Sequence, residues 1–245
     1  MSHEKFNLIL QSRERITPRV MKFAFMREDG EPFTYVPGQF LTLHVPYQDM
    51  VLRRSYSIAT IPDEVDASMV EIAATEVPDG RATGILFDLQ PGERMSATGP
   101  FGRFVPRDDP PSRYVLLATG TGVSPYRAML TTLRQRLAGS GFEARLVLGV
   151  RGPGELLFGQ DFEALARESD NFAFEPVYSR HHPGDEEAGT HGYVQHRLER
   201  LALDPEHDIV YLCGNPVMID ESVALLKARG FTNRGIRREK YVSSN

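Results

Sequence analysis

Apolar and polar side chains alternate along several short stretches in the first hundred residues. Alternation with a period of two is typical of a strand with one buried face. The pattern predicts strand, turn and strand over residues 6–25, then strands over residues 40–45, 52–61 and 69–77. A short helical segment should follow from about residue 80 and end at Leu89, before Pro91 and Gly92. Short strands separated by Pro/Gly turns at this spacing predict an antiparallel β-barrel.

The pattern changes beyond residues 106–112, which are polar and proline-rich. We place the linker there, between a first domain of residues 1–105 and a second of residues 113–245. In the second domain short apolar strands alternate with helices, which predicts a parallel sheet wound with helices and a ligand at the carboxyl ends of the strands. The expected strands are 114–118, 144–150, 172–177 and 209–213, and the expected helices are 125–137, 161–167, 193–201 and 216–228.

Composition narrows the class of protein. The chain has 245 residues, of which 41% are apolar and 25% charged, as in an ordinary soluble globular protein. No apolar run is long enough for a membrane span, and the start of the chain lacks an apolar signal core, so we expect a cytoplasmic protein without membrane contact. Cys213 is the single cysteine, which excludes an internal disulfide and an all-cysteine iron–sulfur cluster. The net charge of −5 gives no reason to expect nucleic-acid binding.

The strand expected at 52–61 carries side chains suited to a flat, anionic ligand. Arg54 and Tyr56 should share one face, and Ser55 and Ser57 the other. An arginine can hold a phosphate through its planar donors, and a tyrosine offers a ring for stacking and a hydroxyl. An amphipathic strand with a solvated charged face is the alternative.

Gly120-Thr121-Gly122 lies between an expected strand and an expected helix. Glycines let the backbone approach a pyrophosphate, and a helix start attracts anions. The third glycine of the usual dinucleotide fingerprint is absent, since Pro125 stands there. Ser124 suits the N-cap of the helix and Pro125 its first position. A plain strand-to-helix turn is the alternative.

Three motifs together resemble those of the ferredoxin–NADP reductase family, and of its bacterial ferredoxin/flavodoxin reductases in particular. They are Arg54-Ser55-Tyr56-Ser57, Gly120-Thr121-Gly122-Val123-Ser124-Pro125 and Cys213-Gly214-Asn215-Pro216-Val217-Met218, in the family's order and spread over nearly the whole chain. The resemblance implies two domains, an antiparallel β-barrel that binds FAD and then an α/β parallel-sheet domain that binds NADP. In the family's pattern Arg54 meets the FAD pyrophosphate, Tyr56 stacks on the isoalloxazine, and Ser57 lies near flavin N5.

The same resemblance assigns further cofactor-binding residues. Ile72, Ala74 and Thr75 would lie on the strand edge that runs along the flavin. Gly80, Ala82 and Thr83 would make the second FAD-phosphate contact, with an ordinary turn and capped helix as the alternative. Ser179 and Arg180 would take the 2′-phosphate of NADP, with Arg151 as a second candidate, while the acids at 185–187 read as a solvated loop. Gly214 would lie by the nicotinamide, and so would Cys213, in a packing role rather than as a nucleophile.

The end of the chain holds two further candidates. Tyr241 would shield the flavin face that nicotinamide approaches, with residues 242–245 holding it, and a frayed terminus is the alternative. Glu239, like Ser57, is a candidate to polarise N5 or to relay protons. His181, His182, His191 and His196 lack the spacing of a metal site, so we expect no metal and a histidine-rich loop on the nucleotide side.

The resemblance implies an oxidoreductase, a ferredoxin/flavodoxin–NADP+ reductase. A hydride passes between nicotinamide C4 and flavin N5, and single electrons pass between FAD and an acidic carrier, ferredoxin or flavodoxin. Basic residues in the first two expected strands would form a docking patch for it, or simply a solvated face: Arg13, Arg15, Arg19, Lys22 and Arg27. We expect a monomer. The alternatives are an NAD(P)H:flavin reductase, an oxygenase reductase component, and a non-catalytic electron-transfer subunit.

Overall fold

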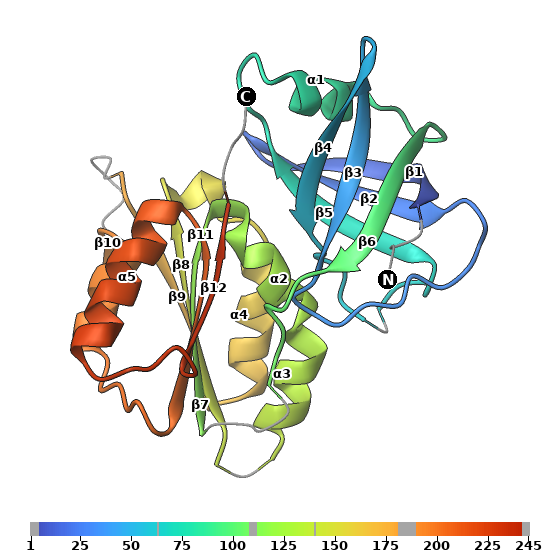
Figure 1. The fold of residues 1–245 in the computed structure, drawn as a ribbon. Coiled ribbons are helices and arrows are strands. Elements are labelled where there is room, and N and C mark those ends of the chain that lie inside the picture. Colours follow the sequence, from blue (N-terminus) through green and yellow to red (C-terminus); the bar gives the residue numbers. More distant parts are fainter. Residues whose placement is uncertain (1–4, 63, 108–111, 140, 181–189, 242–245) are drawn as a thin grey trace. The chain divides into compact units, whose positions relative to one another are not determined.

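The computed structural model describes residues 5–62, 64–107, 112–139, 141–180 and 190–241 (Figure 1). These residues form two compact units. Unit 1 contains the chain up to Pro106 together with Ser124–Thr131, and unit 2 contains Arg107–Val123 and the chain from Thr132 onward. The expected domain limits of 1–105 and 113–245 stay a prediction, and residues 108–111 of the expected linker lie outside the described residues.

Unit 1 is built on an antiparallel sheet with the strand order β4-β3-β6-β1-β2-β5. An isolated bridge between Ile58 and Ile72 joins the two end strands, so the sheet closes into the expected barrel. The strands are β1 (Lys5–Thr17), β2 (Val20–Arg27), β3 (Phe40–Tyr47), β4 (Met50–Ser57), β5 (Met69–Thr75) and β6 (Arg94–Phe101). The unit also contains the helices α1 (Arg81–Asp88) and α2 (Ser124–Ala128).

Alternate side chains of the barrel strands fill its interior. Leu41, Leu43 and Val45 of β3 are fully buried, as are Phe23 and Phe25 of β2. They belong to one hydrophobic core, which the apolar face of α1 joins through Ala82, Leu86 and Phe87. Successive residues of the period-two sequence pattern therefore point alternately into the barrel and out of it.

Unit 2 is a parallel sheet with the order β10-β9-β8-β7-β11-β12. The expected parallel sheet wound with helices is confirmed. The strands are β7 (Arg113–Thr119), β8 (Glu143–Val150), β9 (Phe172–Tyr178), β10 (Thr190–His191), β11 (Asp208–Gly214) and β12 (Ile236–Lys240). The helices are η1 (Gly120–Val123), α3 (Leu130–Leu137), η2 (Pro153–Glu155), α4 (Gly159–Glu168), η3 (Val194–Arg200) and α5 (Pro216–Ala228), of which η1, η2 and η3 are 3-10 helices.

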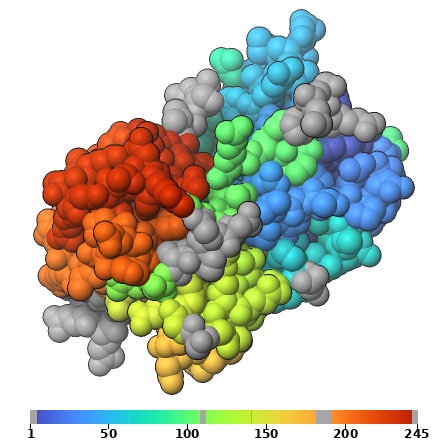
Figure 2. Space-filling view, turned by 60° about the horizontal axis from the view of Figure 1, so that its bottom comes forward, coloured from blue at the N-terminus to red at the C-terminus, as the bar shows by residue number. Residues whose placement is uncertain are grey.

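Helices cover both faces of this parallel sheet. One hydrophobic core joins Val115 and Leu117 of β7 to Leu198 of η3 and to Ile219 of α5. Figure 1 shows α3 and α4 on the other side of the sheet from α5, where Phe162 of α4 lies against Phe174 of β9. In Figure 2 the residues of α5 and of the chain before β11, coloured red and orange, form one continuous surface. The central strands are thus buried on both faces, as parallel strands generally are.

The structure corrects several local expectations. The helix expected over 193–201 is present as the 3-10 helix η3. The helix expected over 125–137 is divided at Met129 into α2 and α3. Ser124 was expected to cap it, but the buried Ser124 hydroxyl has no hydrogen-bond partner among the described residues. The described residues contain no helix both long and apolar enough to cross a membrane.

Candidate functional site

The side chains of β4 alternate as expected, and they place Arg54 and Tyr56 on one face of an edge strand. Both are half-buried, whereas Arg53 and Ser55 are exposed on the opposite face. Ser55 exchanges a 3.0 Å hydrogen bond with the Thr42 hydroxyl of β3, and the Arg54 guanidinium donates to the Arg53 carbonyl at 2.9 Å. Ser57, at the end of β4, is 5% exposed. The arginine and the tyrosine could therefore contact one ligand from the same side.

Tyr56 lies against the barrel core with its ring half-covered. Burial raises the pKa of its hydroxyl to about 12, and the nearby Arg54 charge opposes this rise only in part. The hydroxyl is therefore protonated at neutral pH and can donate a hydrogen bond. The remaining ring surface can stack on a flat ligand.

A gap in strand pairing lies beside Tyr56. Among the described residues, β4 and β5 are bridged only between Ile58 and Ile72. Next to this bridge the Ala59 N–H donates to the Glu71 carbonyl at 2.8 Å. Because backbone groups alternate along a strand, those of Ala73 and Thr75 face the same side as those of Glu71. The open edge of β5 thus offers backbone donors and acceptors to the polar rim of a ring that stacks on Tyr56.

The start of α1 offers backbone groups rather than side chains. The N-cap, Gly80, forms no side-chain capping bond, and the first turn has no acidic residue. The Thr83 hydroxyl donates to the Gly80 carbonyl at 3.1 Å, which engages its one proton within the turn. Ala82 is buried in the barrel core, as are Ile72 and Ala74 of β5. These residues can therefore contribute to a cofactor site through their backbone, and the helix start can attract a phosphate.

In unit 2 the expected pyrophosphate loop packs directly on the end of β11. A Cβ atom at Gly122 would lie 2.4 Å from the Cys213 carbonyl oxygen, so a larger residue would push the strands apart. Gly214 has a φ of +121°, and a Cβ there would lie 2.4 Å from the Thr119 hydroxyl. That hydroxyl accepts from the Asn215 N–H at 2.8 Å. These two glycines therefore let the loop after β7 pack closely on the end of β11. A Cβ atom at Gly120, by contrast, would meet nothing within 4 Å, so the backbone at this glycine is open to an approaching phosphate.

The residues expected to hold a 2′-phosphate lie together at this carboxyl edge. Ser179 and Arg180 follow β9 and are exposed, while Arg151 follows β8 and is half-buried. The Arg180 N–H donates to the Arg151 carbonyl at 2.9 Å, and the Ser179 N–H donates to the Val150 carbonyl at 2.9 Å. Two guanidinium groups and a hydroxyl are thus carried on neighbouring chain segments, an arrangement suited to a dianionic group.

Cys213, Glu239 and Tyr241 also lie together in unit 2. Cys213 is opposite Glu239 in the pairing of β11 with β12, and the Tyr241 N–H donates to the Gly214 carbonyl at 2.8 Å. Burial raises the pKa of the Cys213 thiol well above its ordinary value, and the Glu239 charge raises it further. A hydrogen bond from Tyr241 opposes these effects only in part. A thiol that stays protonated is a poor nucleophile, so the contacts support the packing role expected for Cys213.

Three of the five side chains of the expected basic docking patch form ion pairs: Arg15, Lys22 and Arg27. Arg15 contacts Glu76 at 3.1 Å, and Lys22 contacts Glu14 at 3.1 Å. Arg27 is bound to Asp29 at 2.5 Å. Arg13 donates to the Phe87 carbonyl and to Gln90. Local acids neutralise much of this charge, which favours the alternative of a solvated strand face.

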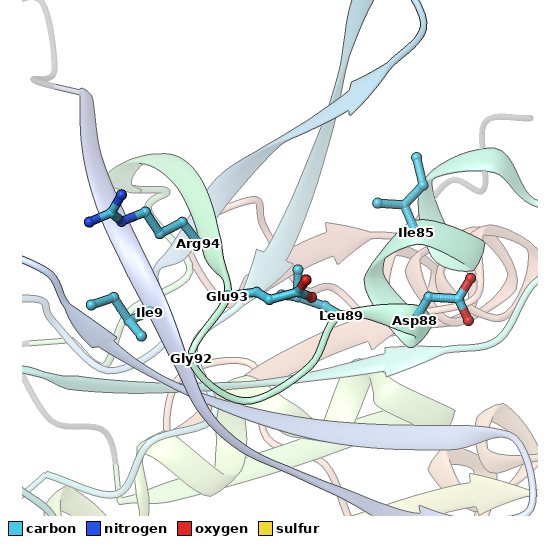
Figure 3. Close-up of a pocket in the computed structure, with 7 residues that line it drawn as sticks. All are labelled: Ile9, Ile85, Asp88, Leu89, Gly92, Glu93 and Arg94. Atoms are coloured by element: carbon cyan, nitrogen blue, oxygen red, sulfur yellow. The ribbon is translucent and has the colours of Figure 1, made fainter.

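A groove of about 700 Å³ on unit 1 contains none of the expected site residues. Figure 3 shows Ile9 of β1, Ile85 and Asp88 of α1, and Arg94 of β6 around it. The Arg94 guanidinium forms an ion pair with Glu28. The Glu93 carboxylate accepts from the Gln90 N–H at 2.7 Å. Arg94 and Glu93 are therefore already engaged by neighbouring groups, and we assign no ligand to this groove.

Sequence reasoning missed three polar or aromatic residues. Asn215 caps α5, since its side chain accepts from the backbone of Val217 and Met218. Tyr193 is 56% exposed after β10, on the carboxyl side of the sheet, with its ring edge-to-face with His196. Arg127 of α2 binds Glu71 of β5. The Asn-Pro sequence is a helix-start signal that could have revealed the cap; the other two have no local signal.

His181, His182 and the acids at 185–187 lie outside the described residues.

Comparison with known proteins matches both halves of the chain. Residues 7–105 match the oxidoreductase FAD-binding domain, and residues 116–223 match the oxidoreductase NAD-binding domain. The chain is 33% identical over 237 residues to ferredoxin–NADP reductase B of Sorangium cellulosum, covering 93% of this chain and 92% of that one. The chain belongs to the ferredoxin–NADP reductase family.

Solved structures of similar proteins extend over the whole chain. The cytochrome P450 reductase GcoB of Amycolatopsis has a TM-score of 0.85 and 30% identity, and the match covers 100% of this chain and 72% of that one. A ferredoxin NADP+ reductase from Neisseria gonorrhoeae, solved with bound FAD and NADP, has a TM-score of 0.81 and 25% identity, with 96% and 98% covered. The protein is thus an oxidoreductase of this family, with an FAD-binding domain followed by an NAD(P)-binding domain. The open backbone at Gly120 and the open edge of β5 fit these two cofactors.

Proposed function

We propose that the protein transfers electrons between NADP(H) and a small carrier protein, ferredoxin or flavodoxin, through FAD. The match to a ferredoxin–NADP reductase over 92% of its length supports this reaction. The observation that carries the choice of NADP is the pair of guanidinium groups after β8 and β9, Arg151 and Arg180, because a 2′-phosphate needs positive charge where a free ribose does not.

The residues of unit 1 hold the flavin in this proposal. Arg54 pairs with the pyrophosphate, and the start of α1 gives its free N–H groups to the same diphosphate. Tyr56 stacks on the isoalloxazine, Ser57 stands near N5, and the edge of β5 at Ala73 and Thr75 binds the polar rim of the ring. When bound, FAD supplies the chemistry that converts two-electron hydride transfer into single-electron transfer. The chain's own groups orient it and leave its reacting edge accessible.

The residues of unit 2 hold the nucleotide. The backbone of Gly120, Thr121 and Gly122 binds the pyrophosphate, and Ser179 with Arg180 and Arg151 binds the 2′-phosphate. Tyr193 offers an exposed ring for the adenine. Cys213 and Gly214 pack beside the nicotinamide, Tyr241 covers the flavin face until nicotinamide arrives, and Glu239 is the candidate for proton relay.

Spectroscopy and turnover test the proposal. The purified protein should be yellow from bound FAD, should reduce ferricyanide with NADPH at a higher kcat/KM than with NADH, and should reduce a ferredoxin or flavodoxin. A colourless protein that gains no flavin on incubation with FAD would remove the flavoenzyme assignment. A flavoprotein that uses NADH and NADPH equally would contradict the role of Arg180. A flavoprotein without turnover would indicate a non-catalytic subunit.

A reductase component of an oxygenase is the second candidate, because GcoB is described as a cytochrome P450 reductase and matches all of this chain. This chain has one cysteine, and that residue is buried, so any iron–sulfur cluster in such a system would belong to another protein or segment. Direct comparison of free ferredoxin, flavodoxin and free flavin as acceptors separates these functions. Rapid reduction of free flavin alone would favour a flavin reductase.

A further inference from the structure

Arg127 lies on α2, in the segment Ser124–Thr131 that belongs to unit 1. Its side chain is 12% exposed. One terminal nitrogen donates to the Glu71 carboxylate at 2.6 Å and to the Ala59 carbonyl at 2.7 Å. A single guanidinium thus binds both segments that meet where the barrel closes.

Glu71 is the centre of a larger network. It is 8% exposed, and its carboxylate also faces Lys22 at 3.6 Å. Its N–H donates to the Thr60 hydroxyl at 2.7 Å. The Tyr35 hydroxyl donates to the Thr60 carbonyl at 2.8 Å. A buried carboxylate must be paired, and this one is paired by side chains of two other elements.

These bonds converge on the point that limits the opening between β4 and β5. The bridge between Ile58 and Ile72 stands beside Ala59 and Glu71. Ser57 is two residues before Ala59 on one side, and Ala73 is two residues after Glu71 on the other. A displacement of either segment at the bridge therefore changes the distance across the opening in which the flavin ring is proposed to lie.

We propose that Arg127 is a positioning residue for the flavin. By clamping Ala59 to Glu71 it sets the separation between Ser57 and the polar edge of β5, and so the fit of the isoalloxazine between them. It does not touch the ring. The role rests on the flavin site described under the proposed function. It means that α2, which directly follows the loop proposed to bind the nucleotide pyrophosphate, helps to shape the flavin site.

The test compares Arg127→Ala, Arg127→Lys and Glu71→Gln with the wild type at saturating FAD. The measurements are the flavin absorbance spectrum, the midpoint potential, the FAD dissociation constant, and kcat and KM with NADPH and ferricyanide. Arg127→Ala should weaken FAD binding by about tenfold or more and shift the spectrum. Arg127→Lys should recover part of both effects. The matched control is Arg134→Ala, which removes an exposed pair with Glu168 at 2.9 Å and should change none of them.

The outcomes separate this role from a general loss of stability and from failure of the flavin site itself. If Arg127→Ala does not fold, Arg127→Lys and Glu71→Gln decide, since each keeps a hydrogen-bonding group. Wild-type spectrum, potential and affinity in every folded variant would overturn the positioning role. In that case, loss of FAD from Arg54→Ala would show that the proposed flavin site is correct even though Arg127 does not position the flavin. A wild-type protein that binds no FAD would instead overturn the proposed function.

Discussion

The backbone N–H of Tyr241 donates to the Gly214 carbonyl at 2.8 Å, next to the buried Cys213. The chain beyond β12 is therefore held against the end of β11 as far as Tyr241. A frayed terminus would leave this bond unmade, so the bond disfavours that alternative for this residue. The arrangement places an aromatic ring and a buried thiol at the carboxyl end of the sheet, where the nicotinamide is proposed to bind.

The first prediction concerns the Cys213 thiol. Burial and Glu239 raise its pKa, so the thiolate fraction is small at pH 8, and the closed surroundings exclude reagents. In the folded protein, reaction with an aromatic disulfide reagent at pH 8 should be about a hundredfold slower than in denaturant. Tyr241→Phe removes the one interaction that lowers this pKa and should not accelerate the reaction. Rapid stoichiometric labelling of the native protein would contradict the burial.

The second prediction concerns the cover over the flavin. Deleting residues 241–245 should tighten NADP+ binding and change the flavin difference spectrum, because nicotinamide no longer has to displace the Tyr241 ring. Turnover should slow if product release becomes limiting. The dissociation constant comes from titration of the flavin spectrum, with Tyr193→Phe as a control that keeps a ring at the adenine end. If spectrum, affinity and turnover are all unchanged, Tyr241 does not belong to the active site.

The third prediction concerns Arg54. Arg54→Ala removes a charged hydrogen bond worth about 1.5–3 kcal/mol to the proposed FAD pyrophosphate, so flavin should be lost on dialysis. Arg53→Ala is the matched control, because it deletes the same side chain from the exposed face of the same strand. Flavin content after dialysis measures both. Equal retention by the two variants would remove Arg54 from the cofactor site.

The fourth prediction concerns the choice between NADPH and NADH. Arg180→Ala should reduce the preference for NADPH by about 1–3 kcal/mol, since the 2′-phosphate loses a charged partner while NADH has none to lose. The ratio of kcat/KM values for the two nucleotides measures it. Arg167→Ala, at an exposed position of α4, should leave the ratio unchanged. An unchanged ratio in Arg180→Ala would shift the assignment to Arg151.

The fifth prediction concerns stability. The Asp208 carboxylate is 3% exposed and is bound by Arg113 at 2.5 Å. A second Arg113 nitrogen donates to its other oxygen at 2.9 Å. Asp208→Asn removes the charge of this pair while Arg113, 23% exposed, keeps its bond to the Ala202 carbonyl, and should lower the free energy of unfolding by about 1.5–3 kcal/mol. Glu168→Gln, in an exposed pair, should cost less than about 1 kcal/mol. Denaturant titration measures both, and equal effects would contradict the difference in burial.

Much of the fold could be predicted because its strands alternate or run apolar over short lengths. The exceptions have physical reasons. Strand β6 carries small residues and the Gly99-Pro100 pair, which read as a turn. Strand β12, Ile236–Lys240, has almost no apolar side chains and is a strand only because β11 offers it a partner. Pairing with a distant strand leaves no local trace in such sequences.

Some features of the candidate site could likewise be predicted from the sequence, and others could not. Arg54 and Tyr56 could be placed on one face because alternation is local. Arg151 and Arg180 follow two neighbouring parallel strands, β8 and β9, so their closeness could also be predicted from the sequence. The pair of Arg127 with Glu71 could not, because it joins residues 56 positions apart through the docking of a helix on another element.

The assignment of α2 to unit 1 has a practical consequence for cutting and recombining the chain. A fragment that stops at Pro106 would lack Arg127 and would leave the Glu71 carboxylate buried with only the more distant Lys22. Chimaeras that exchange the nucleotide half with that of a relative should therefore keep Ser124–Thr131 from the same parent as the barrel. Unit 1 is assembled from two separate stretches of sequence, the chain up to Pro106 and Ser124–Thr131. A crossover point chosen at the proline-rich stretch would separate them.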